Sequence, residues 1–228
     1  MKLKSCLYFL GLTCFPISAM ALMNIFYSFY FDYLTGIKSY TATLFLSFLI
    51  GFFLLKIGKK EKESINIYEQ IFLVFLIYFL ISFFIQIPIY FSDYNVSFID
   101  SYFESISGLT GTGFTIFENV KNLDPPLILW RSSSQWIGGL YFLIFLVLIF
   151  SNKQINFKLV DFSFNLEKKI NFSPNLRSVT TRILFIYSLL TLFIFFIFLI
   201  SGIRIFDSLN LTFTVISSGG FLPTDSLN

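Results

Sequence analysis

The chain has 228 residues, of which 56% are hydrophobic, 21% are aromatic and only 13% are charged, and its formal net charge is +3. A soluble domain carries about a quarter charged residues because its surface faces water, so the composition excludes a soluble globular domain. The sequence contains no histidine, which excludes His-based catalytic triads and His-ligated zinc. The composition therefore predicts an integral membrane protein without His-based catalysis, and we expect that it is not an enzyme.

Five stretches are apolar enough, or nearly so, to cross a bilayer, which requires about 20 mostly apolar residues. They run over approximately residues 6–31, 41–57, 65–91, 127–150 and 183–203. The second stretch is short, but the long side chain of Lys56 can extend to the membrane interface. The two cysteines, Cys6 and Cys14, lie eight residues apart in the first stretch, and we expect packing roles for them rather than a disulfide or a metal site.

The first stretch allows two interpretations. Lys2 and Lys4, the following apolar run and Ala19-Met20-Ala21 resemble a signal peptide with its cleavage site. The sequence stays apolar for ten further residues after Ala21, which favours a helix that is retained in the membrane.

The distribution of lysine and arginine predicts the orientation, because such residues accumulate on the cytoplasmic side. With the N-terminus inside, twelve lysine and arginine residues lie on the inner side and four on the outer side. The outer four are Lys38, Lys121, Arg131 and Arg204. The charge distribution thus predicts a multi-pass membrane protein with a cytoplasmic N-terminus, and we expect the membrane to be a bacterial cytoplasmic (inner) membrane.

The outer connection over residues 92–126 does not look like a plain linker. Residues 98–109 have helical character, and Ser97 and Asp100 suit the cap and first turn of such a helix. The helix is too short to cross the bilayer and is followed by Thr110-Gly111-Thr112-Gly113-Phe114.

A short helix followed by extended Gly/Thr-rich backbone is typical of a re-entrant pore loop. Backbone without helical hydrogen bonds is tolerated at membrane depth where it lines a water-filled path or is buried in protein. Its carbonyl and hydroxyl oxygens can replace the hydration shell of an alkali cation, and the helix C-terminus favours a cation. The alternative is an ordinary outer loop with a surface helix.

An internal repeat favours the pore loop. At a constant offset of 107 residues, Asp100, Ser101, Thr110, Gly113 and Phe114 match Asp207, Ser208, Ser217, Gly220 and Phe221. Each motif follows an apolar span on the predicted outer side, and duplicated units of this kind are typical of transporters.

The residues Phe103 to Gly113 resemble the first pore loop of the Trk/Ktr/HKT potassium transporter family, above all the TrkH type. The run Trp130-Arg131-Ser132-Ser133-Ser134-Gln135-Trp136-Ile137-Gly138-Gly139 is similar to the start of the next span in that family. Glu69, Pro88 and Ser218-Gly219-Gly220-Phe221 also match.

The resemblance implies an all-α membrane protein for K+ uptake, built from span–pore loop–span repeats after an extra helix pair. The domains are then 1–63 for the helix pair, 64–151 for the first repeat, 152–179 for a cytoplasmic connection and 180–228 for the second repeat. The expected K+ ligands, mainly through backbone oxygens, are Thr110, Gly111, Thr112, Gly113, Ser217, Ser218, Gly219 and Gly220. K+ is the transported ion, and no other cofactor is expected.

The resemblance further implies a homodimer of the full-length protein in membrane lipid, with a TrkA-like cytosolic nucleotide-binding regulator and no nucleic acid. Gly111 departs from the family, which usually has Thr there. The sequence ends seven residues after Phe221, so the expectation is the N-terminal half of such a protein, with two of its four repeats. Alternatives are a non-conducting fragment or pseudogene product of the same fold and, with less support, a polytopic membrane enzyme using Glu69, Glu104 or Asp207.

Other residues have two interpretations each. Arg131 and Gln135 are expected to brace the pore loop rather than to contact the ion path. Gly138 and Gly139 are expected to permit close helix packing rather than to act as a hinge. The basic inner segment 151–182 suits either membrane-surface anchoring or docking of a regulator. The sequence does not distinguish a preference for K+ from one for Na+. It also does not distinguish channel-like conduction from transport coupled to protons or sodium.

Overall fold

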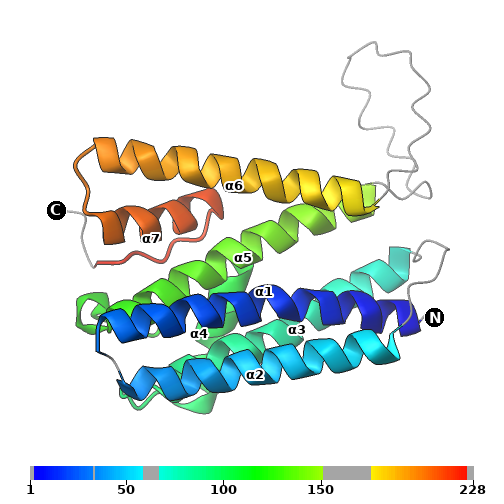
Figure 1. Ribbon diagram of the computed structural model, residues 1–228, viewed down its shortest axis with the longest axis horizontal. Helices are drawn as coiled ribbons and strands as arrows, with labels where there is room; N and C mark the ends of the chain where they lie inside the picture. Colours follow the sequence, from blue (N-terminus) through cyan, green and yellow to red (C-terminus); the bar gives the residue numbers. More distant parts are fainter. Residues whose placement is uncertain (1–2, 33, 59–66, 151–175, 225–228) are drawn as a thin grey trace, which may run out of the picture.

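The computed structural model describes residues 3–32, 34–58, 67–150 and 176–224. Every regular element in these ranges is a helix. The long helices are α1 (Leu3–Tyr30), α2 (Leu34–Ile57), α3 (Ile67–Tyr90), α5 (Pro125–Phe150) and α6 (Leu176–Ile200), and the shorter ones are α4 (Phe98–Thr110), η1 (Val120–Asn122) and α7 (Ile205–Ile216). The long helices run roughly side by side, with α4 and α7 toward the end of the bundle where α6 finishes (Figure 1). The expected all-α fold is confirmed, with a helix pair before two units that each consist of a long helix, a short helix and a loop.

Four helices in the described part of the chain are long and apolar enough to cross a membrane, namely α1, α2, α3 and α6. The second span is longer than expected from the sequence, because α2 already begins at Leu34. The expected span in α5 does not reach the same apolarity over its described residues, because its first half contains Arg131 and Gln135. This polar half is buried in protein rather than exposed to lipid.

Small residues allow α1 and α2 to pack closely. A Cβ on Gly51 would lie 2.9 Å from Cys14 Cβ and 3.1 Å from the Gly11 carbonyl oxygen. Beyond this contact, the hydroxyls of Ser18 and Ser47 lie 2.8 Å apart. Cys6 and Cys14 are both buried free thiols, in agreement with the expected packing role.

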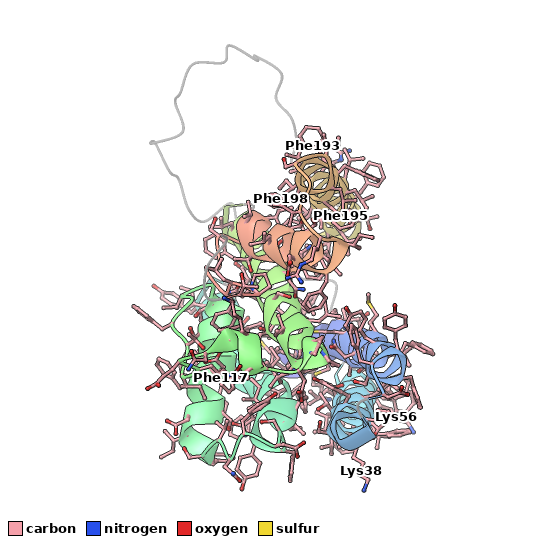
Figure 2. The ribbon with its side chains drawn as sticks, turned by 90° about the vertical axis from the view of Figure 1, so that its left-hand side faces the viewer. Lys38, Lys56, Phe117, Phe193, Phe195 and Phe198 are labelled. Carbon is pink, nitrogen blue, oxygen red and sulfur yellow. The ribbon has the colours of Figure 1, made fainter. Side chains whose placement is uncertain are left out.

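The helix α6 lies at the edge of the bundle, and Phe193, which is 63% exposed, lies on its surface away from the other helices (Figure 2). Only 6% of its most apolar window is buried inside the protein. A helix that is apolar on nearly all sides and this exposed requires a non-aqueous environment. The surface of α6 therefore agrees with a position in lipid.

Candidate ion-pathway site

The short helix α4 begins at the expected cap. The Ser97 hydroxyl accepts a hydrogen bond from the Asp100 backbone N–H at 3.1 Å and donates one to the Asp100 carboxylate at 2.6 Å. In α7 the corresponding carboxylate of Asp207 is held by Arg204, whose Nε lies 2.7 Å from it. An acid in the first turn therefore stabilises the N-terminus of each short helix, although the two helices use different partners.

The backbone after α4 and after α7 follows the same course. Each segment leaves its short helix through two backbone hydrogen bonds, and the two pairs of bonds are related by the offset of 107 residues. They join the Gly111 N–H to the Gly108 carbonyl (3.1 Å), Thr112 to Ser107 (3.0 Å), Ser218 to Val215 (3.1 Å) and Gly219 to Thr214 (2.8 Å). The internal repeat in the sequence therefore corresponds to a repeat in the backbone structure.

A hydroxyl in each short helix closes the loop that follows it. Ser107 Oγ donates to the Phe114 carbonyl at 2.5 Å, and Thr214 Oγ1 donates to the Phe221 carbonyl at 2.6 Å. This pair was not predicted from the sequence. The signal that could have identified it is that Ser107 and Thr214 are both hydroxyl residues at the offset of 107.

Left-handed backbone occurs at matching positions of the two loops. The φ angles are +70° at Gly111, +78° at Gly113, +55° at Ser218 and +113° at Gly220. Glycine adopts such angles without steric cost, whereas a side chain at Ser218 makes this conformation unfavourable by about 1–3 kcal/mol. The peptide planes of both loops are therefore held in an uncommon orientation.

The two loops lie against each other. A Cβ on Gly113 would overlap the Gly219 carbonyl oxygen and lie 3.1 Å from Gly220 Cα, and a Cβ on Gly111 would lie 3.4 Å from the Ser217 carbonyl oxygen. The eight expected ligand residues thus come together from two segments that are distant in sequence. We call residues 110–113 the first filter segment and residues 217–220 the second filter segment.

Hydroxyls of the filter segments are partly engaged by their own helices. Thr110 Oγ1 donates to the Ile106 carbonyl at 2.8 Å, and Ser217 Oγ donates to the Phe213 carbonyl at 2.7 Å. The Thr110 and Thr112 hydroxyls lie 2.7 Å apart, and both residues are exposed. A hydroxyl that donates its proton keeps lone pairs that can face a cation.

A buried ion pair lies behind the first filter segment. Arg131 Nε is 2.8 Å from Glu104 Oε1, and the two side chains are 1% and 0% exposed. The second carboxylate oxygen of Glu104 accepts the Ile116 N–H at 2.8 Å, and Arg131 Nη2 donates to Thr115 Oγ1 at 2.8 Å. Glu104 therefore holds the segment just after the filter and has a structural partner, which disfavours its use as a catalytic acid.

Arg131 also reaches the second loop. Its guanidinium carbon lies 4.3 Å from the centroid of the Phe221 ring, a distance suited to a cation–π contact. One α5 side chain therefore contacts residues that follow both filter segments, as expected for a brace.

Gly138 and Gly139 let α5 approach both loops. A Cβ on Gly138 would overlap the Leu109 carbonyl oxygen at the end of α4. A Cβ on Gly139 would lie 2.9 Å from Ser217 Cβ and 2.7 Å from the Tyr187 hydroxyl. The close-packing interpretation of these glycines agrees with the structure.

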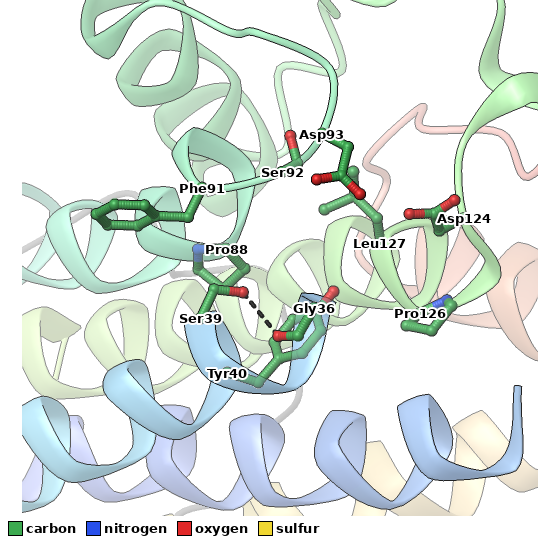
Figure 3. Close-up of a pocket in the computed structure, with 10 residues that line it drawn as sticks. All are labelled: Gly36, Ser39, Tyr40, Pro88, Phe91, Ser92, Asp93, Asp124, Pro126 and Leu127. Carbon is green, nitrogen blue, oxygen red and sulfur yellow. Dashed lines mark hydrogen bonds between the residues drawn. The ribbon is translucent and has the colours of Figure 1, made fainter. Parts of the chain in front are cut away.

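A small pocket lies elsewhere, between the start of α2, the end of α3 and the start of α5 (Figure 3). Tyr40, Asp93 and Asp124 are among its lining residues, and no filter residue lines it. Among the described residues, no group of three or more Cys, Asp or Glu side chains could hold a metal ion. A cation at the filter segments would therefore be bound by backbone and hydroxyl oxygens.

No family model matches the chain. Among curated proteins, it is 33% identical over 188 residues to an uncharacterized cation transporter, MJ1485, of Methanocaldococcus jannaschii, which covers 79% of this chain and 39% of that protein. It is 28% identical over 192 residues to the Trk system potassium uptake protein TrkH of Escherichia coli K12, covering 83% of this chain and 40% of that protein. The chain thus spans about two fifths of the length of these relatives.

Among solved structures, the crystal structure of the potassium transporter TrkH from Vibrio parahaemolyticus has the same fold. The TM-score is 0.83 with 22% sequence identity, over 99% of this chain and 45% of that one. The relatives are named as transporters or uptake proteins rather than enzymes. The resemblance to Trk potassium transporters is therefore confirmed, and the chain is TrkH-like over the part of those proteins that it covers.

Proposed function

We propose that the chain forms part of a K+ uptake pathway, with the two filter segments as part of the ion-binding wall. The observation that carries the proposal is the contact between two repeated loops of left-handed backbone, at Gly113 and Gly220. Backbone outside a helix has free carbonyl oxygens, and oxygen atoms of this kind can replace the water of an alkali cation. The names of the relatives, which refer to potassium uptake, support K+ as the ion.

The electrostatics of the site suit a cation. The C-terminal ends of α4 and α7 lead directly into the filter segments, and each helix end carries a partial negative charge. The Arg131 charge, which would repel a cation, is paired with Glu104 at 2.8 Å. The environment therefore favours a cation, because the partial negative charges of the helix ends are not opposed by an unpaired Arg131 charge.

We propose further that the chain supplies two of four filter segments, with other segments of the same kind completing the ring. The exposure of Thr110, Thr112, Ser218 and Gly220 supports this, because these residues present one side to an open space in the described part of the chain. The division into 1–63, 64–151, 152–179 and 180–228 belongs to the same proposal. A non-conducting product of the same fold is the alternative.

The proposal includes a cellular context. The twelve-to-four bias in lysine and arginine supports a cytoplasmic N-terminus, and the bacterial inner membrane is proposed from the resemblance. A homodimer and a TrkA-like regulator rest on the resemblance alone. The basic segment suggested for docking, 151–182, lies for the most part outside the described residues.

The test is uptake of Rb+, as a K+ analogue, by a bacterium that lacks its own K+ uptake systems and expresses the complete gene product. We expect Rb+ uptake and growth at low external K+ that vector-bearing cells lack. A gene product that reaches the membrane in the same amount as a control transporter but gives no Rb+ uptake would support the non-conducting alternative.

A further inference from the structure

The side chain of Gln135 in α5 lies beside the second filter segment. It is fully buried (0% exposed), and a Cβ on Gly219 would overlap its amide group. Gln135 belongs to the first repeat, whereas Gly219 belongs to the second. The second filter segment therefore packs directly on a polar side chain of the other repeat.

One oxygen of Gln135 holds the second loop at both ends. Gln135 Oε1 accepts the backbone N–H of Phe221, which follows the filter segment, at 3.3 Å. It also lies 2.9 Å from Thr214 Oγ1, which precedes the segment and whose single proton is shared between this oxygen and the Phe221 carbonyl. Because Phe221 donates through a peptide N–H, the atom facing it must be the amide oxygen. The two contacts fix the distance that residues 217–220 must span.

The first loop has a different support. Its outer end is held by the Glu104 carboxylate, which accepts from Thr115 and Ile116. At the offset of 107 residues these three positions are Leu211, Leu222 and Pro223, which offer no carboxylate, no hydroxyl and no backbone N–H at the last position. The second loop thus has no counterpart of Glu104, and Gln135 supports it instead.

We propose that Gln135 is a positioning residue that fixes the second filter segment and thereby sets its ion preference. This inference rests on the proposed function for its ion-selectivity part. The amide Nε2 is buried without a hydrogen-bond partner among the described residues, so every contact that supports the role uses Oε1. A carboxyl group of the same shape retains that oxygen, whereas a thioether of similar volume does not.

The experiment compares Gln135→Met, Gln135→Glu and the control Gln86→Met in the complete gene product. Gln86 is a suitable control because it is also a buried glutamine of an apolar helix, in α3, and its Oε1 has no hydrogen-bond partner among the described residues. Uptake of Rb+ and of Na+ is measured at matched membrane expression. We expect Gln135→Met to lower the Rb+/Na+ uptake ratio about tenfold, which corresponds to about 1.4 kcal/mol. Gln135→Glu and Gln86→Met should change this ratio less than about twofold.

A second measurement does not depend on transport. Hydrogen exchange of the Phe221 amide, followed in purified protein, should be slow in wild type and Gln135→Glu, and at least tenfold faster in Gln135→Met. Unchanged exchange at Phe221 in Gln135→Met, or an equal change in Gln86→Met, would overturn the positioning role. A wild type without any Rb+ over Na+ preference would overturn the proposed function instead, and a Gln135→Met ratio equal to that of wild type would overturn the selectivity role of Gln135.

Discussion

Gly113 and Gly220 pack directly against each other, with only 3.4 Å between Gly113 Cα and the position that a Cβ on Gly220 would take. Both have φ in the left-handed region, and 107 residues separate them in the sequence. Each is followed by a phenylalanine whose carbonyl accepts a hydroxyl of the preceding short helix. This contact joins the two repeats directly through their loops.

The Glu104–Arg131 pair should stabilise the protein strongly only as a pair. Glu104→Gln leaves the Arg131 charge buried without its partner, and loss of one member of a buried ion pair costs about 3–5 kcal/mol. The double variant Glu104→Gln/Arg131→Met should recover a large part of this loss in unfolding measured in detergent.

The matched control for that pair is Arg204–Asp207, in which the Arg204 side chain is 78% exposed. Exposed pairs contribute about 0–1 kcal/mol, so Arg204→Gln should have a small effect. Equal effects of Glu104→Gln and Arg204→Gln would contradict the assignment of Glu104–Arg131 as the brace of the first loop.

Gly138 should tolerate no side chain. In Gly138→Ala the new methyl group overlaps the Leu109 carbonyl oxygen, which is backbone and can move only with the end of α4. Overpacking of this kind costs about 1–3 kcal/mol, and Rb+ uptake should fall because the first filter segment follows Leu109 directly. In the control Gly36→Ala the methyl group would lie 3.3 Å from the edge of the Tyr40 ring, and a wild-type-like result is expected; the same loss in both variants would refute the packing role.

Much of this arrangement could be predicted from the sequence, because apolar length and the repeat at 107 residues define the spans and the loops. The Ser97 cap and the contact role of Gly138 also followed from local patterns. The bond from Gln135 to Phe221, 86 residues apart, could not be predicted, because no periodicity relates a span to a loop of another repeat. The start of α2 at Leu34 was missed for a different reason: Thr35, Lys38 and Ser39 lower the apolarity of its first turns.

The orientation of the chain predicts accessibility to membrane-impermeant thiol reagents in intact cells. In a background without Cys6 and Cys14, Lys121→Cys should be labelled and Lys168→Cys should not, because twelve of sixteen basic residues fall on the predicted inner side. Position 168 lies outside the described residues. Labelling at 168 without prior permeabilisation would reverse the proposed topology.

The 228-residue chain reconstituted alone in liposomes should carry no Rb+ flux above that of protein-free vesicles. In the described part of the chain, the two filter segments form one wall with exposed residues such as Thr112 and Gly220, and open backbone facing lipid is unfavourable. A matched preparation of the complete gene product is the positive control. Flux through the 228-residue chain that Gly113→Ser abolishes would instead indicate that several copies assemble into a pore.

The most direct test of the ion-pathway proposal is the Rb+/Na+ uptake ratio of Gly113→Ser in the complete gene product, at matched membrane expression. In Gly113→Ser the new Cβ must overlap the Gly219 carbonyl oxygen, and the serine backbone must also adopt a φ of +78°. Both filter segments therefore have to shift. We expect the ratio to move toward Na+ by about tenfold, which corresponds to about 1.4 kcal/mol, or Rb+ uptake to be lost. Uptake and selectivity equal to those of wild type would show that Gly113 does not line the ion pathway.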